Sequence, residues 1–431
     1  MHTLTGKGWI FLLLAVVMLF GCQPRYRPDI SHSTPEASSS AAEPQVVSLP
    51  EEPLPPPLPE PEQPRRLTLV AVGDLMAHWD QIEDALTPEG DYDFTHSFEA
   101  VKEDLSQGYT LGNLETVFGG EALGYSSYPR FSTPDAYGKA LKEAGFDFVS
   151  TCNNHSLDRD AFGVLRTLEV LDSIGLAHTG SYASKEDAQN ITIVEAQGMK
   201  IAILAFTFST NGIPLPKDAP WMVNMLTTEK MVSDFQKARA LNPDLIVAMP
   251  HMGNEYETYT RDVFLDWMDL MLYHGADLVL ASHPHVLQPM MMRELTDVEG
   301  VTRQGFIIAS LGNFISVQRE EPRDMSIILK IDLSQQEGQR PVIESVRFVP
   351  IWVSYRDNTG NVNIRVVPVG DALKGLEGDN PLGLNPWDAD RLKRANRDIV
   401  SLFLGESAIP EKVEREYVFY QRHPPAAQES A

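Results

Sequence analysis

The chain has 431 residues, of which 43% are hydrophobic, and a formal net charge of −25. This length is enough for one large domain or two ordinary ones, and the apolar content is enough for a substantial core. The negative charge argues against nucleic acid as a partner, because its phosphates would be repelled.

The first residues are typical of an export signal. Lys7 precedes the apolar stretch WIFLLLAVVMLFGC, which is short for a transmembrane helix. Gly21 followed by Cys22 resembles a bacterial lipoprotein signal, although Phe20 departs from the small residue usual at its position. Such a cysteine is acylated and becomes the mature N-terminus. We therefore predict a signal peptide over residues 1–22, lipidation of Cys22, and an extracytoplasmic protein attached to the cell membrane. An uncleaved anchor is the alternative, and it also places the rest outside the membrane.

Residues 23–66 are rich in Pro, Glu, Ser and Ala, as in PEASSSAAEPQ and EEPLPPPLPEPEQP. Such a segment cannot bury enough apolar area to offset the entropy lost on ordering. Its proline-rich half favours extended polyproline II. We predict a disordered tether over this range and a second disordered segment over residues 421–431.

Short apolar runs then alternate with helical patterns over residues 67–318. The runs are RRLTLVAVGDLM, FDFVSTCNNH, KIAILAFT, DLIVAMPH, ADLVLASH and GFIIASLGN. The segment DAFGVLRTLEVLDSIG predicts a helix that ends at Gly175 as a C-cap. Its apolar residues at helical spacing are Phe162, Leu165, Leu168 and Leu171. This alternation predicts an α/β architecture with buried sheets.

After about Asn313 the pattern changes to longer strands. MSIILKIDL and PVIESVRFVPIWVSY are joined by SQQEGQR, which predicts a hairpin that extends a sheet. We therefore predict that residues 319–420 form a β-rich extension of the same domain.

Residues with metal-ligand chemistry follow the predicted strands. In open α/β sheets, ligands bind at the carboxyl ends of strands, so we expect these residues to meet. They are Asp74 in GDLMAH, Glu115 in GNLET, Asn154 and His155 in CNNHSLD, His251 in MPHMGNEY, His283 and His285 in ASHPH, and Asn313 in SLGNF.

Each of these residues alone has an ordinary explanation. A single Asp after a strand is usually a turn former or cap, and a single His is more often structural than a ligand. Their recurrence at successive strand ends favours a metal site. Carboxylate, amide oxygen and imidazole suit Mn²⁺, Zn²⁺ or Fe²⁺. A shared carboxylate can hold two ions about 3.5–4 Å apart, which activate water and stabilise a phosphoryl transition state. His155 would then protonate a leaving oxygen, with Asp158 orienting it.

The ordered motifs VGDLM, GNLE, NNHSLD, PHMGNEY, SHPHVLQP and SLGNF resemble the CapA family, the poly-γ-glutamate capsule synthesis proteins. The resemblance covers roughly residues 67–316. That family is similar to the calcineurin-like metallophosphoesterases, so the resemblance implies a two-sheet αββα sandwich with a C-terminal β extension. It places Asp74 as the first metal aspartate and Glu115 where a bridging aspartate would be. It assigns the remaining ligands to Asn154, His251, His283 and His285, with His155 as the catalytic partner of Asn154.

The sequence departs from the superfamily pattern at Met76, where a histidine is expected. A thioether is a poor ligand for a hard ion, so one metal position could be weak, empty or completed by another group. His78 is a candidate substitute, and a surface or core histidine is the more ordinary interpretation. Met252 replaces a tryptophan that is usual in the family.

Three further residues are candidates for substrate binding: Arg130 in YPRFSTPD, Glu255 and Asn313. Arg130 could clamp an anionic group or be an ordinary surface arginine. Glu255 could support the site or make only a local hydrogen bond. Cys152 has no partner for an intramolecular disulfide if Cys22 is lipidated. It is either a reactive thiol beside the ligands or a small buried residue.

The sequence thus favours an exported, lipid-anchored, metal-dependent hydrolase of the phosphoesterase type. The resemblance implies a role in synthesis, export or anchoring of an anionic capsule polymer, with that polymer or its synthesis machinery as partner. A non-catalytic scaffold or polymer-binding component with the same fold is the alternative, and Met76 favours it. A peptide or amide hydrolase with the same ligands is a third possibility.

Overall fold

The computed structural model describes residues 63–423 of the chain. The predicted signal peptide, the lipidation site, residues 23–62 of the predicted tether and residues 424–431 of the predicted tail lie outside this range. Regular structure begins at Arg65, inside the segment predicted as tether, because Arg65 and Arg66 already pair with β12. At the other end, the last strand reaches Gln421.

The first sheet runs in the order β14-β13-β12-β1-β2-β3-β4, with β11 beside β1 and β15 beside β13. Strands β1 to β4 are parallel, and β12 joins β1 in antiparallel register. The strands are β1 (Arg65–Leu75), β2 (Tyr109–Leu114), β3 (Phe148–Ser150), β4 (Ala177–Thr179), β11 (Asn313–Ile315), β12 (Met325–Gln335), β13 (Val342–Arg356), β14 (Val362–Pro368) and β15 (Tyr417–Gln421).

The second sheet runs in the order β5-β6-β7-β8-β10-β9. Its four inner strands are parallel, and each edge strand is antiparallel to its neighbour. The strands are β5 (Thr192–Ala196), β6 (Met199–Thr207), β7 (Leu245–His251), β8 (Leu278–Leu280), β9 (Leu287–Thr296) and β10 (Thr302–Leu311).

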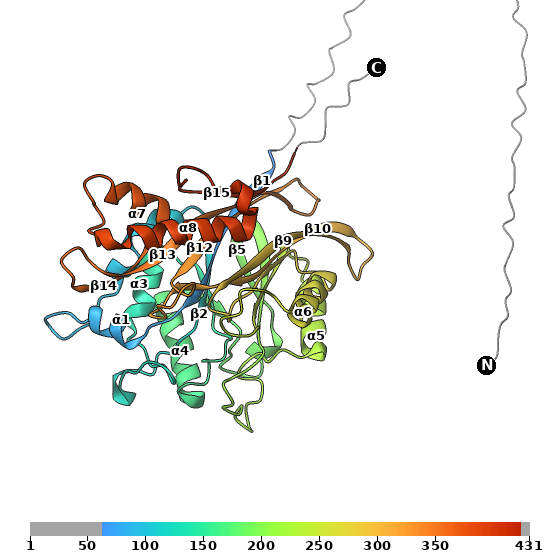
Figure 1. Ribbon diagram of the computed structural model, residues 1–431. Coiled ribbons are helices and arrows are strands. Elements are labelled where there is room, and N and C mark those ends of the chain that lie inside the picture. The colour runs from blue at the N-terminus through green and yellow to red at the C-terminus, as the bar shows by residue number, and fades with distance from the viewer. Residues whose placement is uncertain (1–62, 424–431) are drawn as a thin grey trace, which may run out of the picture. The chain divides into compact units, whose positions relative to one another are not determined.

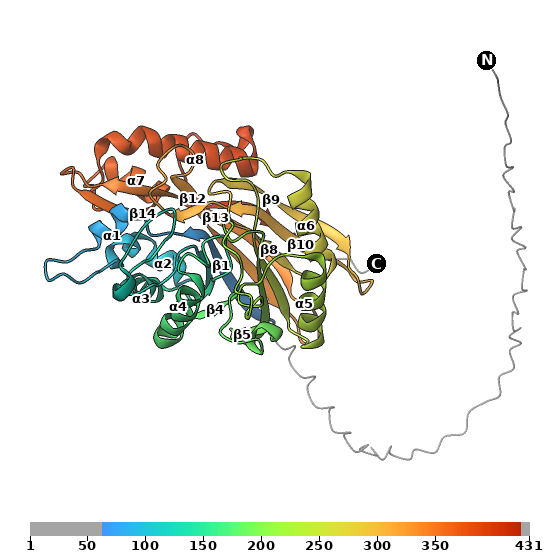
Figure 2. The same cartoon turned by 90° about the horizontal axis from the view of Figure 1, so that it is seen from below.

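Helices α3 and α4 cover the outer face of the first sheet, and α5 and α6 cover that of the second, whereas α7 and α8 pack against the core between the sheets (Figures 1 and 2). The α-helices are α1 (Trp79–Asp84), α2 (Lys102–Leu105), α3 (Ala136–Ala144), α4 (Asp160–Ile174), α5 (Thr228–Ala240), α6 (Asp262–Tyr273), α7 (Val369–Leu376) and α8 (Ala389–Leu404). The 3-10 turns are η1 (Thr95–Ser97), η2 (Glu99–Val101), η3 (Glu121–Leu123), η4 (Asp187–Gln189), η5 (Pro386–Asp388) and η6 (Glu406–Ala408).

Three apolar cores hold these layers together. One core lies between the sheets and joins residues of β1 and β12 to residues of β6 and β7. A second core packs the outer face of the first sheet against α3 and α4, and a third packs α5 and α6 against the second sheet. Side chains along a strand point alternately to the two faces of its sheet. Each sheet therefore contributes apolar side chains both to the core between the sheets and to the core beneath its own helices. The predicted αββα sandwich is confirmed.

Helix α4 ends as predicted, with Gly175 in the left-handed conformation at φ 66°. Its buried face differs from the predicted one, because Phe162 and Leu165 are exposed while Leu168 and Leu171 are buried. Each residue turns a helix by about 100°, so a step of three residues drifts around the helix by about 60°. Four apolar residues spaced three apart therefore cannot all face one core.

The predicted hairpin forms from β12 and β13, which pair in antiparallel register. The segment after it also contains two helices that the sequence did not indicate, and α8 packs against the core between the sheets. Lys330 of β12, which is buried, forms ion pairs with Asp104 and Glu416. Arg415 donates to both oxygens of Asp104, so the C-terminal segment is tied to α2.

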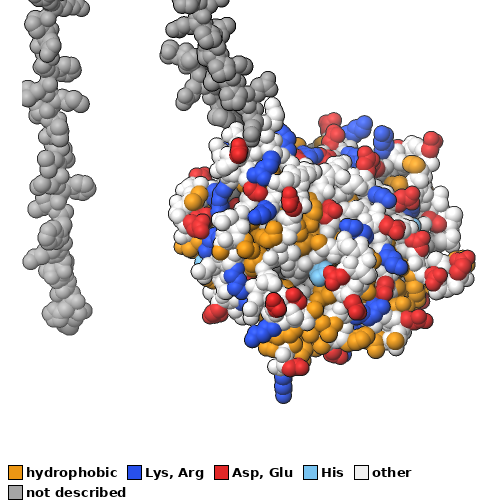
Figure 3. Space-filling view, turned by 180° about the vertical axis from the view of Figure 1, so that it is seen from behind, with side chains coloured by type: hydrophobic (Ala, Val, Ile, Leu, Met, Phe, Trp, Pro, Cys, Tyr) orange, Lys and Arg blue, Asp and Glu red, His pale blue; other side chains and the backbone are white. Residues whose placement is uncertain are grey.

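The surface carries both charge signs. On the face in Figure 3, acidic and basic side chains are interspersed with patches of apolar ones. Within residues 63–423, no helix combines the length and the apolar character that crossing a bilayer requires.

Candidate metal centre

The carboxyl ends of strands from both sheets meet at one place. Asp74 is the last residue but one of β1, Glu115 directly follows β2, and His251 ends β7. Ligand atoms of these three residues lie within 4.8 Å of one another, and so do ligand atoms of Glu115, His283 and His285. Glu115 belongs to both groups. The structure therefore brings both carboxylates and all three histidines of the predicted ligand set into one cluster.

Glu115 is the centre of this cluster. Its carboxylate is fully buried, and neither oxygen has a hydrogen-bond partner among the described residues. One oxygen lies 3.6 Å from His251 Nε2 and 3.7 Å from His285 Nε2. Burial, and then the nearby Asp74 carboxylate, raise the pKa of Glu115 well above its usual range. A buried carboxylate without donors, facing two imidazoles, fits a cation between them.

His285 is oriented by oxygen atoms on its other side. Its Nδ1 lies 3.1 Å from Asp74 Oδ2 and 3.0 Å from Asn313 Oδ1. A proton on Nδ1 therefore has two acceptors, and Nε2 is left with its lone pair toward Glu115. Carboxylate and amide partners of this kind fix the ring of a metal-ligating histidine.

His251 connects the two sheets through amide side chains. Its Nε2 lies 2.8 Å from Asn154 Oδ1, and its Nδ1 lies 3.1 Å from Asn113 Nδ2. Asn113 also donates to Asp74 Oδ1 at 2.8 Å. Burial, and then the neighbouring His283 and His285, lower the pKa of His251 well below its usual range. The imidazole is thus held neutral, which is the form that binds metal.

His283 and His285 lie in a strained loop between β8 and β9. Their φ angles are 107° and 60°, in the region that favours glycine. His283 Nδ1 is buried without a hydrogen-bond partner among the described residues, and burial first of all lowers the pKa of His283 to about 4. Strain of this kind persists where surrounding contacts over-determine the backbone, and it clusters at functional sites. Pro284 between the two histidines helps to limit the loop to this conformation.

His155 and Asp158 form a buried pair beside the ligands. His155 Nδ1 lies 2.7 Å from Asp158 Oδ2, and the same oxygen accepts the backbone N–H of Phe131 at 2.6 Å. The ring of Phe131 packs edge-on against His155, with centroids 4.7 Å apart. Asn211 Nδ2 lies 3.5 Å from His155 Nε2, which places Nε2 on the side of the loop after β6. This geometry suits a general acid held by a carboxylate.

Met76 is buried, and its backbone carbonyl accepts hydrogen bonds from Gln81 and Tyr137. His78 lies two residues further on, and its Nδ1 accepts the backbone N–H of Val317 at 3.3 Å. Burial first of all lowers the pKa of His78 to about 4. Because Nδ1 accepts this hydrogen bond, the neutral ring carries its own proton on Nε2. Within residues 63–423, neither group of converging ligand atoms includes His78, so the structure does not put it in the place of the missing histidine.

The three predicted substrate contacts have different surroundings. Arg130 Nε donates to the carbonyl of Asp158 at 2.7 Å, and Arg130 Nη2 donates to Asp160 at 3.1 Å, so the guanidinium holds the loop that carries His155. Glu255 is exposed and follows β7. Asn313 places its amide between His285 and the carbonyl of Arg323. Substrate binding by these residues stays a prediction.

Three residues of the site were missed by the sequence analysis. Asn113 lies within β2, two positions before Glu115. It belongs to the same GNLET motif, which could have identified it. Asn211 follows the end of β6, so the expectation that polar residues at strand ends meet applies to it as well. Tyr256 donates its backbone N–H to the carbonyl of Pro284 at 2.8 Å, and its signal was its place at the end of the PHMGNEY motif.

Of the two interpretations of Cys152, a reactive thiol or a small buried residue, the structure supports the second. Its thiol is fully buried and lies 3.2 Å from the carbonyl oxygen of Asn224, and burial strongly raises its pKa. A protonated, inaccessible thiol is a poor nucleophile.

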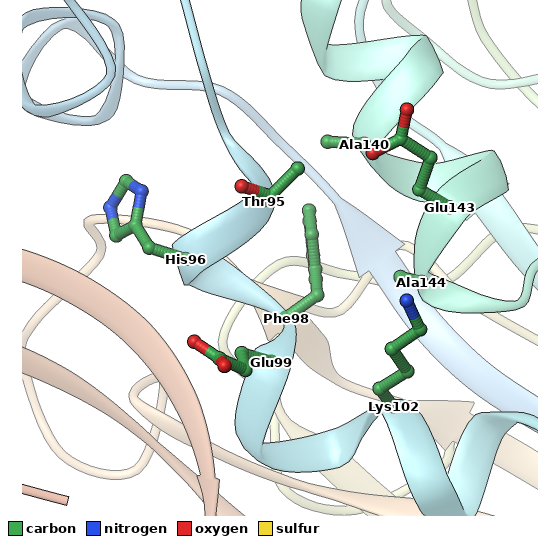
Figure 4. Close-up of a pocket in the computed structure, with 8 residues that line it drawn as sticks. All are labelled: Thr95, His96, Phe98, Glu99, Lys102, Ala140, Glu143 and Ala144. Atoms are coloured by element: carbon green, nitrogen blue, oxygen red, sulfur yellow. The ribbon is translucent and has the colours of Figure 1, made fainter.

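A separate hollow of about 350 Å³ lies between η1 and α3, and none of its residues belongs to the ligand cluster. In Figure 4, His96 stands on the opposite side of Phe98 from Lys102 and Glu143. His96 Nε2 also forms a hydrogen bond with Asp84 Oδ2 at 2.9 Å. These groups do not converge on a common point, so the ligand cluster remains the candidate functional site.

Fold and site together define a two-sheet αββα protein with a buried carboxylate–imidazole–amide cluster at the strand ends. The chain belongs to the bacterial capsule synthesis protein family PGA_cap, whose family model matches residues 68–318. The CapA resemblance predicted from the motifs is thereby confirmed.

Two relatives of the chain are named CapA. The chain is 30% identical over 258 residues to the capsule biosynthesis protein CapA of Bacillus anthracis, covering 58% of this chain and 60% of that protein. It is 30% identical over 185 residues to the PGA biosynthesis protein CapA of Bacillus subtilis (strain 168), covering 41% of this chain and 44% of that protein. The matched region thus spans less than two thirds of either relative.

Among solved structures, the NAD nucleotidase NadN of Haemophilus influenzae overlaps 77% of this chain and 59% of its own. The TM-score is 0.42 and the identity 14%, so the likeness is weak.

Proposed function

We propose that this chain is a metal-dependent hydrolase of the phosphoesterase type that acts in the synthesis, export or anchoring of an anionic cell-envelope polymer. One observation carries the proposal: the Glu115 carboxylate is buried without hydrogen-bond donors and faces two imidazoles at 3.6 and 3.7 Å. A divalent cation would satisfy both the carboxylate and the imidazole lone pairs.

The residues that would hold the metal are Asp74, Glu115, Asn154, His251, His283 and His285. Mn²⁺, Zn²⁺ and Fe²⁺ all suit this donor set, and the shared Glu115 is compatible with two ions. A bound divalent ion supplies Lewis acidity and lowers the pKa of water at the site.

The chain's own residues supply the proton transfer. As the oxygen of a water molecule bonds to phosphorus and the bond from phosphorus to the leaving oxygen breaks, doubly protonated His155 gives its Nε2 proton to that oxygen and keeps the proton on Nδ1. Asp158 holds the Nδ1–H of the same ring and stabilises its charged form. Once Nε2 has given up its proton, the Nδ2–H of Asn211 can donate to it.

The proposal extends to location. Cys22 would be lipidated, and residues 23–62 would tether the described domain to the outer side of the cell membrane. The family's role in capsule biosynthesis supports an anionic polymer or its synthesis machinery as partner. Labelling of growing cells with a clickable palmitate tests the anchor: we expect label on the wild type and none on Cys22→Ala.

A purified protein tests the catalytic proposal. Metal content would be measured first, followed by hydrolysis of bis(4-nitrophenyl) phosphate with added Mn²⁺. We expect bound metal, and turnover that His155→Ala abolishes while metal content is retained. A metal-free protein of full stability and without turnover would support the non-catalytic scaffold instead, which the buried thioether of Met76 favours.

A further inference from the structure

Arg323 lies in the loop that joins β11 to β12, and its backbone is tied to the ligand cluster. Its carbonyl oxygen accepts a hydrogen bond from Asn313 Nδ2 at 3.1 Å. The other end of the same amide, Asn313 Oδ1, lies 3.0 Å from His285 Nδ1. The Asn313 amide therefore connects the backbone of Arg323 to His285, a proposed metal ligand.

The side chain of Arg323 is held over the ring of Tyr256. The central carbon of the guanidinium is 3.6 Å from the ring centroid, which is a close cation–π contact. The Tyr256 ring in turn lies 6.0 Å from the ring of His285, and its backbone N–H donates to Pro284 between the two histidines. Tyr256 has a φ of 67°, in the region that favours glycine, so its backbone is strained.

The guanidinium keeps free hydrogen-bond donors. Arg323 Nη1 donates to Glu320 at 3.0 Å, and the Glu320 side chain is 73% exposed. Within residues 63–423, no acceptor is bonded to Nε or Nη2 of Arg323. An exposed pair within one loop contributes little, so it does not compete strongly with a ligand. The planar guanidinium fork matches carboxylate and phosphate oxygens.

We propose that Arg323, held in place by Tyr256, forms an anion-binding subsite beside the ligand cluster. It selects substrates that carry a second anionic group, a carboxylate or a phosphate, near the group bound at the metal. Glu255 carries the opposite charge next to Tyr256, and within residues 63–423 no ion pair joins it to Arg323, whose ion pair is with Glu320. The inference rests on the proposed function, because the first anionic group is the phosphoryl group of that substrate.

Arg319 provides a matched control in the same loop. Its guanidinium carbon lies 4.6 Å from the ring centroid of Tyr355, so it also makes a cation–π contact. Tyr355 donates a hydrogen bond to Asp80 of α1, and within residues 63–423 no hydrogen bond joins it to the ligand cluster. Replacing Arg319 removes the same charge from the same loop without touching the proposed subsite.

Two phosphonates that cannot be hydrolysed test the subsite by calorimetry with the Mn²⁺-loaded full chain. Phenylphosphonate carries one anionic group, and 4-carboxyphenylphosphonate carries a second. We expect the wild type to bind the carboxylate form about ten-fold tighter, as one charge-assisted contact provides. Arg323→Met should reduce this ratio to about one, Arg323→Lys should keep part of it, and Arg319→Met should leave it unchanged.

Three results would overturn the subsite. The wild type could bind the two phosphonates with equal affinity, it could bind neither, or the affinity ratio could persist in Arg323→Met. Thermal unfolding of each variant checks that the fold is retained. The phosphonates are not turned over, so this result is independent of catalysis. Selective binding without hydrolysis of bis(4-nitrophenyl) phosphate would leave the subsite standing and reject the hydrolase.

Discussion

Asp158 Oδ2 accepts from two directions: it lies 2.7 Å from His155 Nδ1 and 2.6 Å from the backbone nitrogen of Phe131. The carboxylate is fully buried, so it cannot turn away without breaking a backbone hydrogen bond. It therefore fixes the direction of the imidazole and holds a proton on Nδ1.

Replacement of Asp158 by Asn should separate catalysis from metal binding. The amide keeps the shape but loses the charge that stabilises protonated His155, so we expect kcat to fall by about 10²–10⁴-fold. Metal content should not change, because Asp158 is not among the proposed ligands. Steady-state kinetics and metal analysis of the same preparation check both points, and loss of metal together with activity would contradict the assignment.

Met76→His should restore the histidine that the superfamily pattern expects. An imidazole is a far better ligand than a thioether for Mn²⁺ or Fe²⁺. We expect titration calorimetry to show a higher Mn²⁺ stoichiometry or an affinity at least about ten-fold tighter than that of the wild type. Met252→His, which adds an imidazole at another buried methionine, is the control. An unchanged isotherm for Met76→His would mean that position 76 does not face the ions.

Gly73 allows β1 and β11 to approach closely enough to place Asp74 beside Asn313. A methyl group at Gly73 would lie 1.8 Å from the carbonyl oxygen of Gly312, which is a backbone atom and cannot move aside easily. We expect Gly73→Ala to lower the free energy of unfolding by about 3 kcal/mol or more. Urea denaturation measures this. Gly378→Ala, whose nearest atom would be 3.8 Å away, should change stability by less than about 1 kcal/mol.

The buried ion pairs of Asp104 predict a dependence of stability on pH. Burial would raise the pKa of Asp104, but hydrogen bonds from Arg415 and Lys330 outweigh it and hold the pKa below its usual range. A carboxyl group with a lowered folded pKa stabilises the fold above its unfolded pKa of about 3.9. That contribution disappears as the pH falls through the folded value.

We therefore expect Asp104→Asn to lower stability by about 3–5 kcal/mol at neutral pH, because Lys330 stays buried with one partner fewer. The variant should also lose the part of the acid-induced destabilisation that arises from this group. Asp371→Asn removes only a half-exposed partner of Arg415 and should cost less than about 1 kcal/mol. Urea denaturation at several pH values measures both variants, and equal losses would contradict this account.

Much of the fold and the cluster could be predicted because they depend on local patterns. Short apolar runs with polar ends identified β1, β3, β6, β7, β8 and β10, and the parallel arrangement of strands explains why Asp74 and Glu115 meet. The meeting of His251 and His285 with Glu115 also requires a particular packing of one sheet on the other. The resemblance to a family implied that packing, and the apolar pattern alone did not.

Other features depend on contacts that leave no local trace. Asn113 is a strand residue like any other until β1 and β7 place Asp74 and His251 on its two sides. The exposure of Phe162 follows from where α4 meets the sheet, which helical spacing does not determine. His78 illustrates a further limit, because the backbone N–H of Val317, 239 positions away, determines which ring nitrogen carries the proton.

The central claim is that Glu115 helps to cage a divalent cation, and calorimetric titration of Mn²⁺ into the metal-stripped full chain tests it most directly. The wild type should bind at least one equivalent, and Glu115→Gln should bind about 100-fold more weakly or not at all. Glu337→Gln, at an exposed glutamate in the β12–β13 turn, should titrate like the wild type. A wild type that takes up no Mn²⁺, Zn²⁺ or Fe²⁺, or a Glu115→Gln variant with unaltered affinity, would contradict the account.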